Sequence, residues 1–212
     1  MQISRAFPDR GLYAITDGPR PDLLDACARA LAGGARMLQY RDKTTDHARR
    51  RSEASALLEL CTRHGIPLVI NDDVALARAI GAHGVHLGEH DGSLTAARSQ
   101  LGLDAIIGVS CYDSVTLAQQ AAELGASYVA FGAFFASPTK PLARRASIEL
   151  LRQSAALGLP RVAIGGITPD NGAALVEAGA DYLAVISAVF GSADVRASAQ
   201  RFASLYPSRD QA

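Results

Sequence analysis

The chain of 212 residues contains no tryptophan, and aromatic residues make up only 6% of it. It also lacks net charge, because 21 lysines and arginines balance 21 aspartates and glutamates. Without an excess of positive charge there is no long-range field to attract DNA or RNA, so nucleic acid is not expected as a partner. No apolar run reaches the ~18 residues of a membrane span, since the longest extends only from Tyr182 to Phe190. We therefore expect no membrane segment, and the residues from Met1 to Arg5 lack the apolar core of a signal peptide.

Cysteine is scarce as well. Cys27, Cys61 and Cys111 are odd in number and widely spaced, which argues against a disulfide framework and against a zinc-binding pattern. A reducing cytoplasm is therefore the expected location. Hydrophobic residues make up 49% of the chain, as is typical of globular proteins, and no linker rich in proline, serine or glycine divides it. We expect one domain over residues 1–206, followed by a flexible tail at 207–212.

Short apolar runs alternate with alanine- and leucine-rich stretches of helical periodicity along the whole chain. We predict strands at residues 11–16, 37–40, 67–71, 84–87, 106–110, 128–131, 161–164 and 182–186. We predict helices at residues 21–31, 46–64, 74–80, 94–101, 114–124, 148–157, 171–178 and 193–205. The strand segments are continuously apolar, which is typical of parallel strands buried on both faces. The alternation therefore predicts an α/β fold of parallel strand–helix–strand units.

A weak internal repeat indicates how these units are arranged. Four segments in which a helix ends at a Gly-Ala pair and a strand follows begin at Gly34, Gly81, Gly125 and Gly179. Their spacings of 44 to 54 residues each accommodate two strand–helix units, so the repeat marks every second strand of an eightfold arrangement. We therefore predict a single (β/α)8 TIM barrel, with an open doubly wound sheet as the alternative.

In such barrels the active site lies at the carboxyl ends of the strands. Gln39, Arg41 and Lys43 alternate after the second predicted strand, so an extended backbone places their side chains on one side. Arginine and lysine donors suit a diphosphate or triphosphate. Asp72 and Asp91 follow neighbouring predicted strands and are candidates for sharing one Mg²⁺. The alternative interpretation is that these residues are solvated charges and helix caps.

A second candidate site follows the last two predicted strands. Gly165 and Gly166 come after the seventh strand, and Ser187 and Ala188 come after the eighth. Loops at these positions commonly bind phosphate in TIM barrels, and glycines let backbone amides approach an anion. The alternative is that these segments are plain turns.

Two further motifs and one cysteine fit zinc peptidase, serine acyl-enzyme and cysteine nucleophile chemistry, respectively, only poorly. The segment from His86 to His90 matches the HxxEH pattern of zinc peptidases, but it begins on a predicted strand instead of a helix. The segment from Ser137 to Lys140 matches SxxK, but it contains a proline and lacks the partner motifs of a serine acyl-enzyme. Cys111 has no evident histidine base, so we interpret it as a small buried thiol.

From about Gly11 to Phe190 the chain resembles the thiamine phosphate synthase family. The resemblance rests on residues 38–43 (LQYRDK), 70–72 (IND), 84–88 (GVHLG), 108–110 (GVS), 137–140 (SPTK), 164–167 (IGGI) and 185–188 (VISA). Each segment alone is a weak signal. Together, in order and each at the end of a predicted strand, they are specific.

The resemblance implies a magnesium-dependent transferase. Such an enzyme joins 4-amino-2-methyl-5-hydroxymethylpyrimidine diphosphate to 4-methyl-5-(2-phosphooxyethyl)thiazole, or its carboxylate form, and yields thiamine monophosphate and pyrophosphate. The implied route is dissociative, through a pyrimidine cation, and needs no protein nucleophile. By the resemblance the pyrimidine diphosphate is bound by Gln39, Tyr40, Arg41, Asp42, Lys43, Asn71, Ser110 and Lys140, of which Arg41, Lys43, Ser110 and Lys140 are catalytic. The resemblance places Mg²⁺ on Asp72 and Asp91, and the thiazole phosphate on Ser137, Pro138, Thr139, Gly166, Ile186 and Ser187.

The chain also departs from the family pattern. Glu89 stands where the family usually has glutamine, His83 stands where it usually has aspartate, and residues 136–140 read ASPTK where PTxTK is usual. Two alternatives use the same barrel. A thiazole tautomerase-like isomerase needs the thiazole phosphate site but not the diphosphate and metal residues, and a non-catalytic protein would bind a phosphate ligand only. We expect a homodimer, from the habits of small cytoplasmic enzymes.

Overall fold

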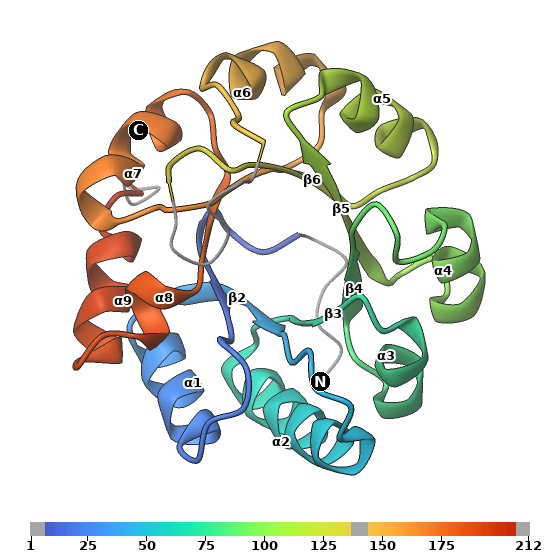
Figure 1. The fold of residues 1–212 in the computed structure, drawn as a ribbon, viewed down its shortest axis with the longest axis vertical. Coiled ribbons are helices and arrows are strands. Elements are labelled where there is room, and N and C mark those ends of the chain that lie inside the picture. The colour runs from blue at the N-terminus through green and yellow to red at the C-terminus, as the bar shows by residue number, and fades with distance from the viewer. Residues whose placement is uncertain (1–6, 137–143, 207–212) are drawn as a thin grey trace.

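The computed structural model describes residues 7–136 and 144–206, in which eight parallel strands close into a barrel surrounded by helices (Figure 1). The strands are β1 (Gly11–Ile15), β2 (Ala35–Tyr40), β3 (Leu68–Asn71), β4 (Gly84–Leu87), β5 (Ile106–Tyr112), β6 (Tyr128–Phe131), β7 (Arg161–Ile164) and β8 (Tyr182–Val185). The helices are α1 (Leu23–Ala32), α2 (His47–His64), α3 (Val74–Ile80), α4 (Leu94–Leu101), α5 (Val115–Glu123), α6 (Glu149–Gln153), α7 (Pro169–Glu177), α8 (Ser187–Phe190) and α9 (Val195–Ala203). Each strand pairs with the next along the chain, and β8 pairs with β1. The predicted TIM barrel is therefore confirmed, and the open sheet is excluded.

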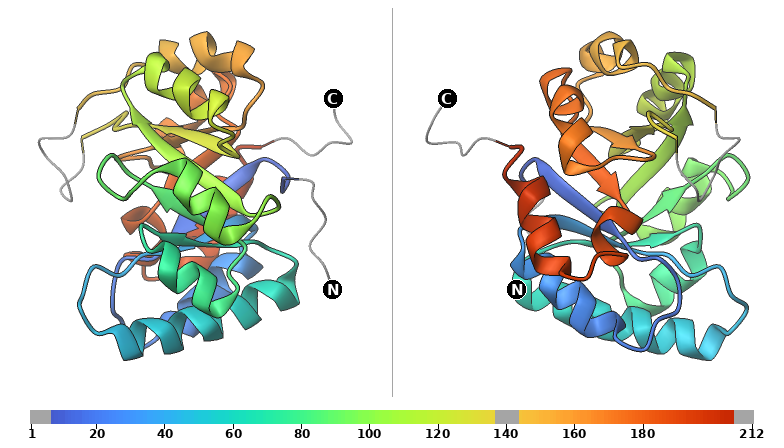
Figure 2. Two further views of the ribbon diagram at one scale, coloured as in Figure 1. Left: turned by 90° about the vertical axis from the view of Figure 1, so that its right-hand side faces the viewer. Right: turned by 60° about the vertical axis from the view of Figure 1, so that its left-hand side comes forward.

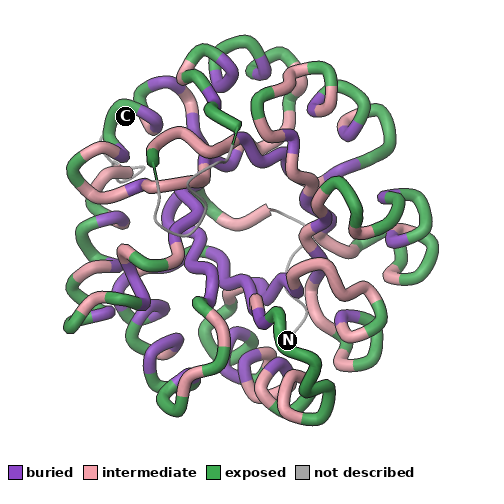
Figure 3. The backbone as a smooth tube through the Cα atoms, viewed as in Figure 1, coloured by how far each residue is buried: buried purple, intermediate pink, exposed green. Residues whose placement is uncertain are grey.

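Residues of each strand alternate between two apolar environments. One set fills the inside of the barrel and consists of Tyr13, Ile15, Met37, Val69, Tyr128, Ala130, Val162, Tyr182 and Ala184. The intervening residues, such as Leu12, Leu38 and Ile70, pack in a larger cluster that includes the inner faces of the helices. Figure 3 shows the result as a largely buried ring of strands, with helices that are exposed only on their outer sides. Burial of both strand faces explains why the strand segments are continuously apolar.

The barrel has two different ends. Loops that follow the strands extend from one end, and the first and last described residues lie at the other (Figure 2). At this second end the ring of Phe7 packs edge-on against Tyr128 and Tyr182, with centroids 5.8 and 5.5 Å apart. Tyr128 takes up the space beside β5, where a Cβ on Gly108 would lie 1.9 Å from its Cζ atom. Glycine at position 108 is therefore a packing requirement of the barrel interior.

Local sequence signals set the helix ends. The side chains of Asp46 and Asp73 cap α2 and α3, because each accepts a hydrogen bond from the backbone of the third helical residue, Arg49 N and Leu76 N. Two differences from the predicted elements stand out. The predicted helix 148–157 is α6 followed by a 3-10 helix, Ser154–Leu157. The short helix α8 was not predicted, because its four residues continue the apolar run of β8.

Candidate active site

The end of β2 divides its side chains between the barrel interior and the helices. The Gln39 side chain points inward, where its Nε2 donates to the hydroxyl of Tyr13 at 2.7 Å. The buried Thr16, which follows β1, holds the backbone of Arg41 just after β2. Its Oγ1 accepts from Arg41 N at 2.8 Å and donates to Arg41 O at 3.1 Å. This double contact fixes the backbone from which the Arg41 side chain projects.

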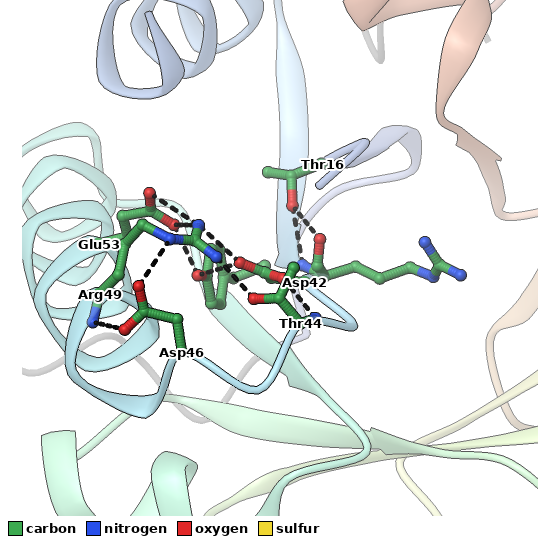
Figure 4. A network of polar contacts seen from close by, with 8 residues as sticks. Thr16, Asp42, Thr44, Asp46, Arg49 and Glu53 are labelled. Atoms are coloured by element: carbon green, nitrogen blue, oxygen red, sulfur yellow. Dashed lines mark hydrogen bonds and ion pairs between the residues drawn. The ribbon is translucent and has the colours of Figure 1, made fainter. Parts of the chain in front are cut away.

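Asp42 points the other way, toward α2 (Figure 4), and the contact of Tyr40 with Glu53 places its side chain on the same side. The Tyr40 hydroxyl donates to Glu53 at 2.7 Å, and the fully buried Asp42 carboxylate pairs with Arg49 at 2.8 Å. Asp42 also accepts from Thr44 N at 2.8 Å, and these contacts hold its pKa below the usual range although burial opposes them. Asp42 nonetheless lines the same pocket as the predicted ligands Lys43, Asn71 and Asp72, whereas Tyr40 does not line it. Through their contacts with Glu53 and Arg49, Tyr40 and Asp42 lie against α2. They anchor the loop that carries Arg41 and Lys43 to the first turns of α2.

Charged groups gather at the ends of β2, β3 and β4. Lys43 Nζ forms an ion pair with Asp72 Oδ2, and Asp91 Oδ2 accepts from Gly88 N at 2.8 Å. A pocket of about 540 Å³ beside them is lined by five of the predicted site residues, Asp42, Lys43, Asn71, Asp72 and Asp91, together with Arg50 and Asp73. Gln39, Arg41 and Ser110 do not line this pocket.

Sequence reasoning missed Arg50, which lies within a run of three arginines on α2. Its guanidinium pairs with Asp73 at 2.9 Å, and its buried Nε has no hydrogen-bond partner within residues 7–136 and 144–206. A basic run on a helix normally indicates a solvated face, so no sequence signal distinguished this arginine from its neighbours.

The two carboxyl groups of the pocket influence each other. Burial raises the pKa of Asp72, and the Asp91 carboxyl raises it further against the opposing effect of Lys43. The pKa of Asp91 is lowered, because hydrogen bonds from Asp72 and from the Gly88 amide outweigh its burial. Two carboxyl groups that share a site in this way are poised to be neutralised by a cation.

The donor set fits magnesium. Asp72 and Asp91 offer hard oxygen ligands in the loops that follow the neighbouring strands β3 and β4, and in the described part of the chain no third histidine, cysteine or acidic side chain joins them in a metal-binding group. Magnesium is commonly held by one or two carboxylates, with phosphate oxygens and water completing its octahedron. The Asp72 backbone has a φ of 63°, a left-handed conformation that aspartate tolerates better than most residues.

A chain of polar groups crosses the barrel interior beneath this site. Tyr13 Oη and Tyr128 Oη lie 2.9 Å apart, and Tyr128 Oη lies 2.9 Å from His86 Nδ1. On its other side His86 Nε2 lies 2.9 Å from Ser110 Oγ, and burial lowers the pKa of this histidine to about 4. Together with the Gln39 contact, this chain connects two predicted substrate ligands through Tyr13, Tyr128 and His86, none of which the sequence predicted as a ligand.

The loops after β7 and β8 form the second candidate site. A Cβ on Gly166 would lie 2.4 Å from the carbonyl oxygen of Ala136, so glycine lets this loop pack closely against the loop after β6. Asn171 donates to Gly166 O at 3.1 Å and caps α7 with Thr168. Ile186 and Ser187 stand at the start of α8, which has no side-chain cap. The predicted ligands Ser137, Pro138, Thr139 and Lys140 lie outside the described residues.

The remaining motifs are explained by packing. Glu89 pairs with Arg144 at 3.6 Å, and Arg144 covers the ring of Tyr112, so the Glu89 carboxylate reaches toward the loop before α6. His86 bonds inside the barrel, whereas His90 is exposed, so the HxxEH segment does not present a histidine pair. Cys111 is buried, which raises its pKa to about 12, as expected for an inert thiol. Within the described ranges, no helix is long and apolar enough to cross a membrane.

Known proteins are similar to this chain in sequence and in fold. A model of the thiamine monophosphate synthase family matches residues 12–189. A thiamine-phosphate synthase from Xanthomonas campestris pv. campestris is 55% identical over 194 residues, which cover 91% of this chain and 94% of the relative. One from Acidithiobacillus ferrooxidans is 53% identical over 208 residues, covering 95% and 96%. The structure of thiamine phosphate pyrophosphorylase from Pyrococcus furiosus is 33% identical, with a TM-score of 0.83 and coverage of 92% and 94%.

Proposed function

The chain belongs to the thiamine monophosphate synthase family and is a transferase, and from this premise we propose how it acts. Its substrates are 4-amino-2-methyl-5-hydroxymethylpyrimidine diphosphate and 4-methyl-5-(2-phosphooxyethyl)thiazole or its carboxylate form. The products are thiamine monophosphate and pyrophosphate. The observation that carries the proposal is the cluster of Lys43, Asn71, Asp72 and Asp91 around one pocket at the strand ends.

The diphosphate is placed at the ends of β2, β3 and β4. Lys43 supplies positive charge in the pocket there, and Asn71 supplies an amide. Arg41, which follows β2 but does not line this pocket, belongs to the set by the family resemblance. Asp72 and Asp91 would hold Mg²⁺, which when bound neutralises charge on the leaving diphosphate. Arg41 and Lys43 add hydrogen-bond donors whose stabilising effect increases as negative charge develops on the leaving oxygen. Lys140, outside the described residues, belongs to this set by the family resemblance alone.

The reaction follows a dissociative route. The bond between the pyrimidine methylene carbon and the diphosphate oxygen breaks, and its electron pair leaves with the diphosphate. The thiazole nitrogen then donates its lone pair to the methylene carbon of the pyrimidine cation. Such a route needs charge stabilisation and exclusion of water, not a protein nucleophile. The inert Cys111 thiol and the inward-bonded Ser110 agree with that requirement.

The thiazole phosphate is placed at the loops after β7 and β8. Gly166, Ile186 and Ser187 are the described members of this subsite, and the uncapped amides at the start of α8 suit an anion. Ser137, Pro138 and Thr139 complete the proposed set.

Thermal unfolding tests both subsites separately. We expect pyrophosphate to raise the midpoint only when Mg²⁺ is present, and the thiazole phosphate to raise it without metal. A ligand at 100 times its Kd adds about 2.7 kcal/mol to the free energy of unfolding. Stabilisation by the thiazole phosphate alone would favour the isomerase, and stabilisation by inorganic phosphate without magnesium would favour a simple binding protein.

A further inference from the structure

Five polar side chains form one continuous hydrogen-bonded chain from β2 to β5 through the barrel interior. The links are Gln39 Nε2 to Tyr13 Oη at 2.7 Å, then Tyr13 Oη to Tyr128 Oη, Tyr128 Oη to His86 Nδ1 and His86 Nε2 to Ser110 Oγ, each at 2.9 Å. Gln39, Tyr13 and Tyr128 are at most 2% exposed, so water does not compete for these groups. Both ends of the chain are residues of the proposed pyrimidine diphosphate site.

The donors in this chain can be assigned by counting protons. Gln39 Nε2 is a donor only, so Tyr13 Oη accepts from it. The single proton of Tyr13 then has one partner left within the described residues, the oxygen of Tyr128. The proton of Tyr128 must in turn go to His86 Nδ1. An imidazole that accepts at Nδ1 carries its proton at Nε2, and that proton is donated to Ser110 Oγ.

Other protonation patterns leave a buried group without a partner. If His86 donated from Nδ1, as the other tautomer and the doubly protonated ring both do, Tyr128 would have to donate to Tyr13. The Tyr13 proton would then face the Gln39 amide nitrogen, which does not accept hydrogen bonds. An unpaired buried hydroxyl proton is costly, so the chain favours a single direction of donation.

The geometry points to a polarised relay in which Tyr13, Tyr128 and His86 act as positioning residues for the two substrate ligands at its ends. Gln39 uses its amide nitrogen inward, which leaves its carbonyl oxygen to accept from substrate. Ser110 accepts inward, which leaves its hydroxyl proton to donate to substrate. An aminopyrimidine carries the complementary set, because its amino group donates and its ring nitrogens accept. This assignment rests on the proposed function only for the identity of that substrate.

Nitrogen NMR of the intact protein labelled with ¹⁵N-histidine tests the relay without any substrate. The sequence has five histidines, and a His86→Gln variant identifies the His86 signals by their loss. We expect His86 as a single neutral tautomer with its proton on Nε2. A proton on Nδ1, a doubly protonated ring at pH 7 or an even mixture of tautomers would overturn the relay. A protein with the expected tautomer but no synthase activity would contradict the proposed function and leave the relay intact.

A variant at the far end of the chain gives a sharper test. In Gln39→Glu the carboxylate has no proton to donate, so Tyr13 donates to it and every later link reverses. We expect the His86 proton to move from Nε2 to Nδ1, although His86 does not touch residue 39. Retention of the Nε2 proton in Gln39→Glu at pH 6 to 9 would overturn the inference.

Tyr128→Phe interrupts the relay, and Tyr182→Phe is its matched control. Tyr182 lies in the same interior cluster, but its hydroxyl donates to the Pro8 carbonyl outside the relay. In Tyr128→Phe we expect mixed His86 tautomers and a loss of up to about tenfold in kcat/KM for the pyrimidine diphosphate, the value of one hydrogen bond. The KM for the thiazole phosphate should not change. Tyr182→Phe should alter neither the His86 tautomer nor kcat/KM for the pyrimidine diphosphate. Equal losses in the two variants would mean that Tyr128 serves packing alone.

Discussion

Replacement of Asp72 by asparagine separates the proposed metal ligand from the fold. Asparagine keeps the shape of the side chain and tolerates the left-handed φ of 63° at this position. Alanine is a poorer choice, because a left-handed conformation costs most residues about 1–2 kcal/mol. In a chain of this length 1 kcal/mol corresponds to roughly 2–4 °C in Tm, so Asp72→Ala would mix strain with the loss of a ligand.

Without ligands the asparagine variant should be at least as stable as the wild type at neutral pH. The raised pKa of Asp72 means that the folded state holds this proton more tightly than the unfolded chain. The ionised carboxylate therefore reduces the free energy of unfolding as pH rises through the folded pKa, and asparagine removes that cost. Loss of the ion pair with Lys43, which is 58% exposed, should matter little. The advantage of Asp72→Asn should shrink as pH falls from the raised folded pKa toward about 4, and it should be absent at lower pH, where Asp72 is protonated in both states.

With ligands the order should reverse. At 100 times its Kd, magnesium pyrophosphate should stabilise the wild type by about 2.7 kcal/mol, or roughly 5–10 °C, and the variant far less. Product formation, followed as thiochrome fluorescence, should fall about 100-fold or more. Asp113→Asn, an exposed aspartate that follows β5 at the same end of the barrel, is the matched control. A ligand-induced shift in Asp72→Asn equal to that of the wild type would refute the metal assignment.

Two further predictions concern the scaffold of the site. Gly108→Ala places a Cβ 1.9 Å from Tyr128 Cζ, so urea unfolding should show that the free energy of unfolding falls by about 1–3 kcal/mol or more. Gly125→Ala is the control, because its Cβ meets open space and its φ of 83° adds only backbone strain. Equal losses in the two variants would contradict the packing argument. Asp42 pairs with Arg49 and has a lowered pKa, so Arg49→Ala should reduce the free energy of unfolding above pH 4. This reduction should become smaller as pH falls further and Asp42 is protonated. A reduction that is constant from pH 7 to pH 3 would show that this ion pair does not stabilise the loop.

The sequence predicted the barrel well because its signals are local. Continuous apolar strands and the repeated Gly-Ala turns each follow from a few neighbouring residues. The helix α8 escaped prediction because a four-residue helix carries no periodicity of its own. The change from α-helix to 3-10 helix at Ser154 is likewise not apparent from the amino-acid composition.

The site was predictable only in part. Alternation along β2 separates the inward side chain of Gln39 from those of Tyr40 and Asp42, which contact α2. Alternation does not show that Asp42 also lines the pocket at the strand ends. The relay through Tyr13, Tyr128 and His86 joins residues up to 115 positions apart, and hydrogen bonds across a barrel leave no pattern in one sequence. From sequence alone a buried tyrosine is interpreted as a core residue, because the hydrogen-bond partner of its hydroxyl is not known.

Synthesis of thiamine monophosphate is the most direct test of this account. Purified protein is mixed with the pyrimidine diphosphate and the thiazole phosphate, with Mg²⁺ or with a chelator, and thiamine monophosphate and pyrophosphate are both quantified. The account predicts the two products in equal amounts, only when both substrates and Mg²⁺ are present. Folded protein that yields no thiamine monophosphate, or yields it equally well in the chelator, would contradict it.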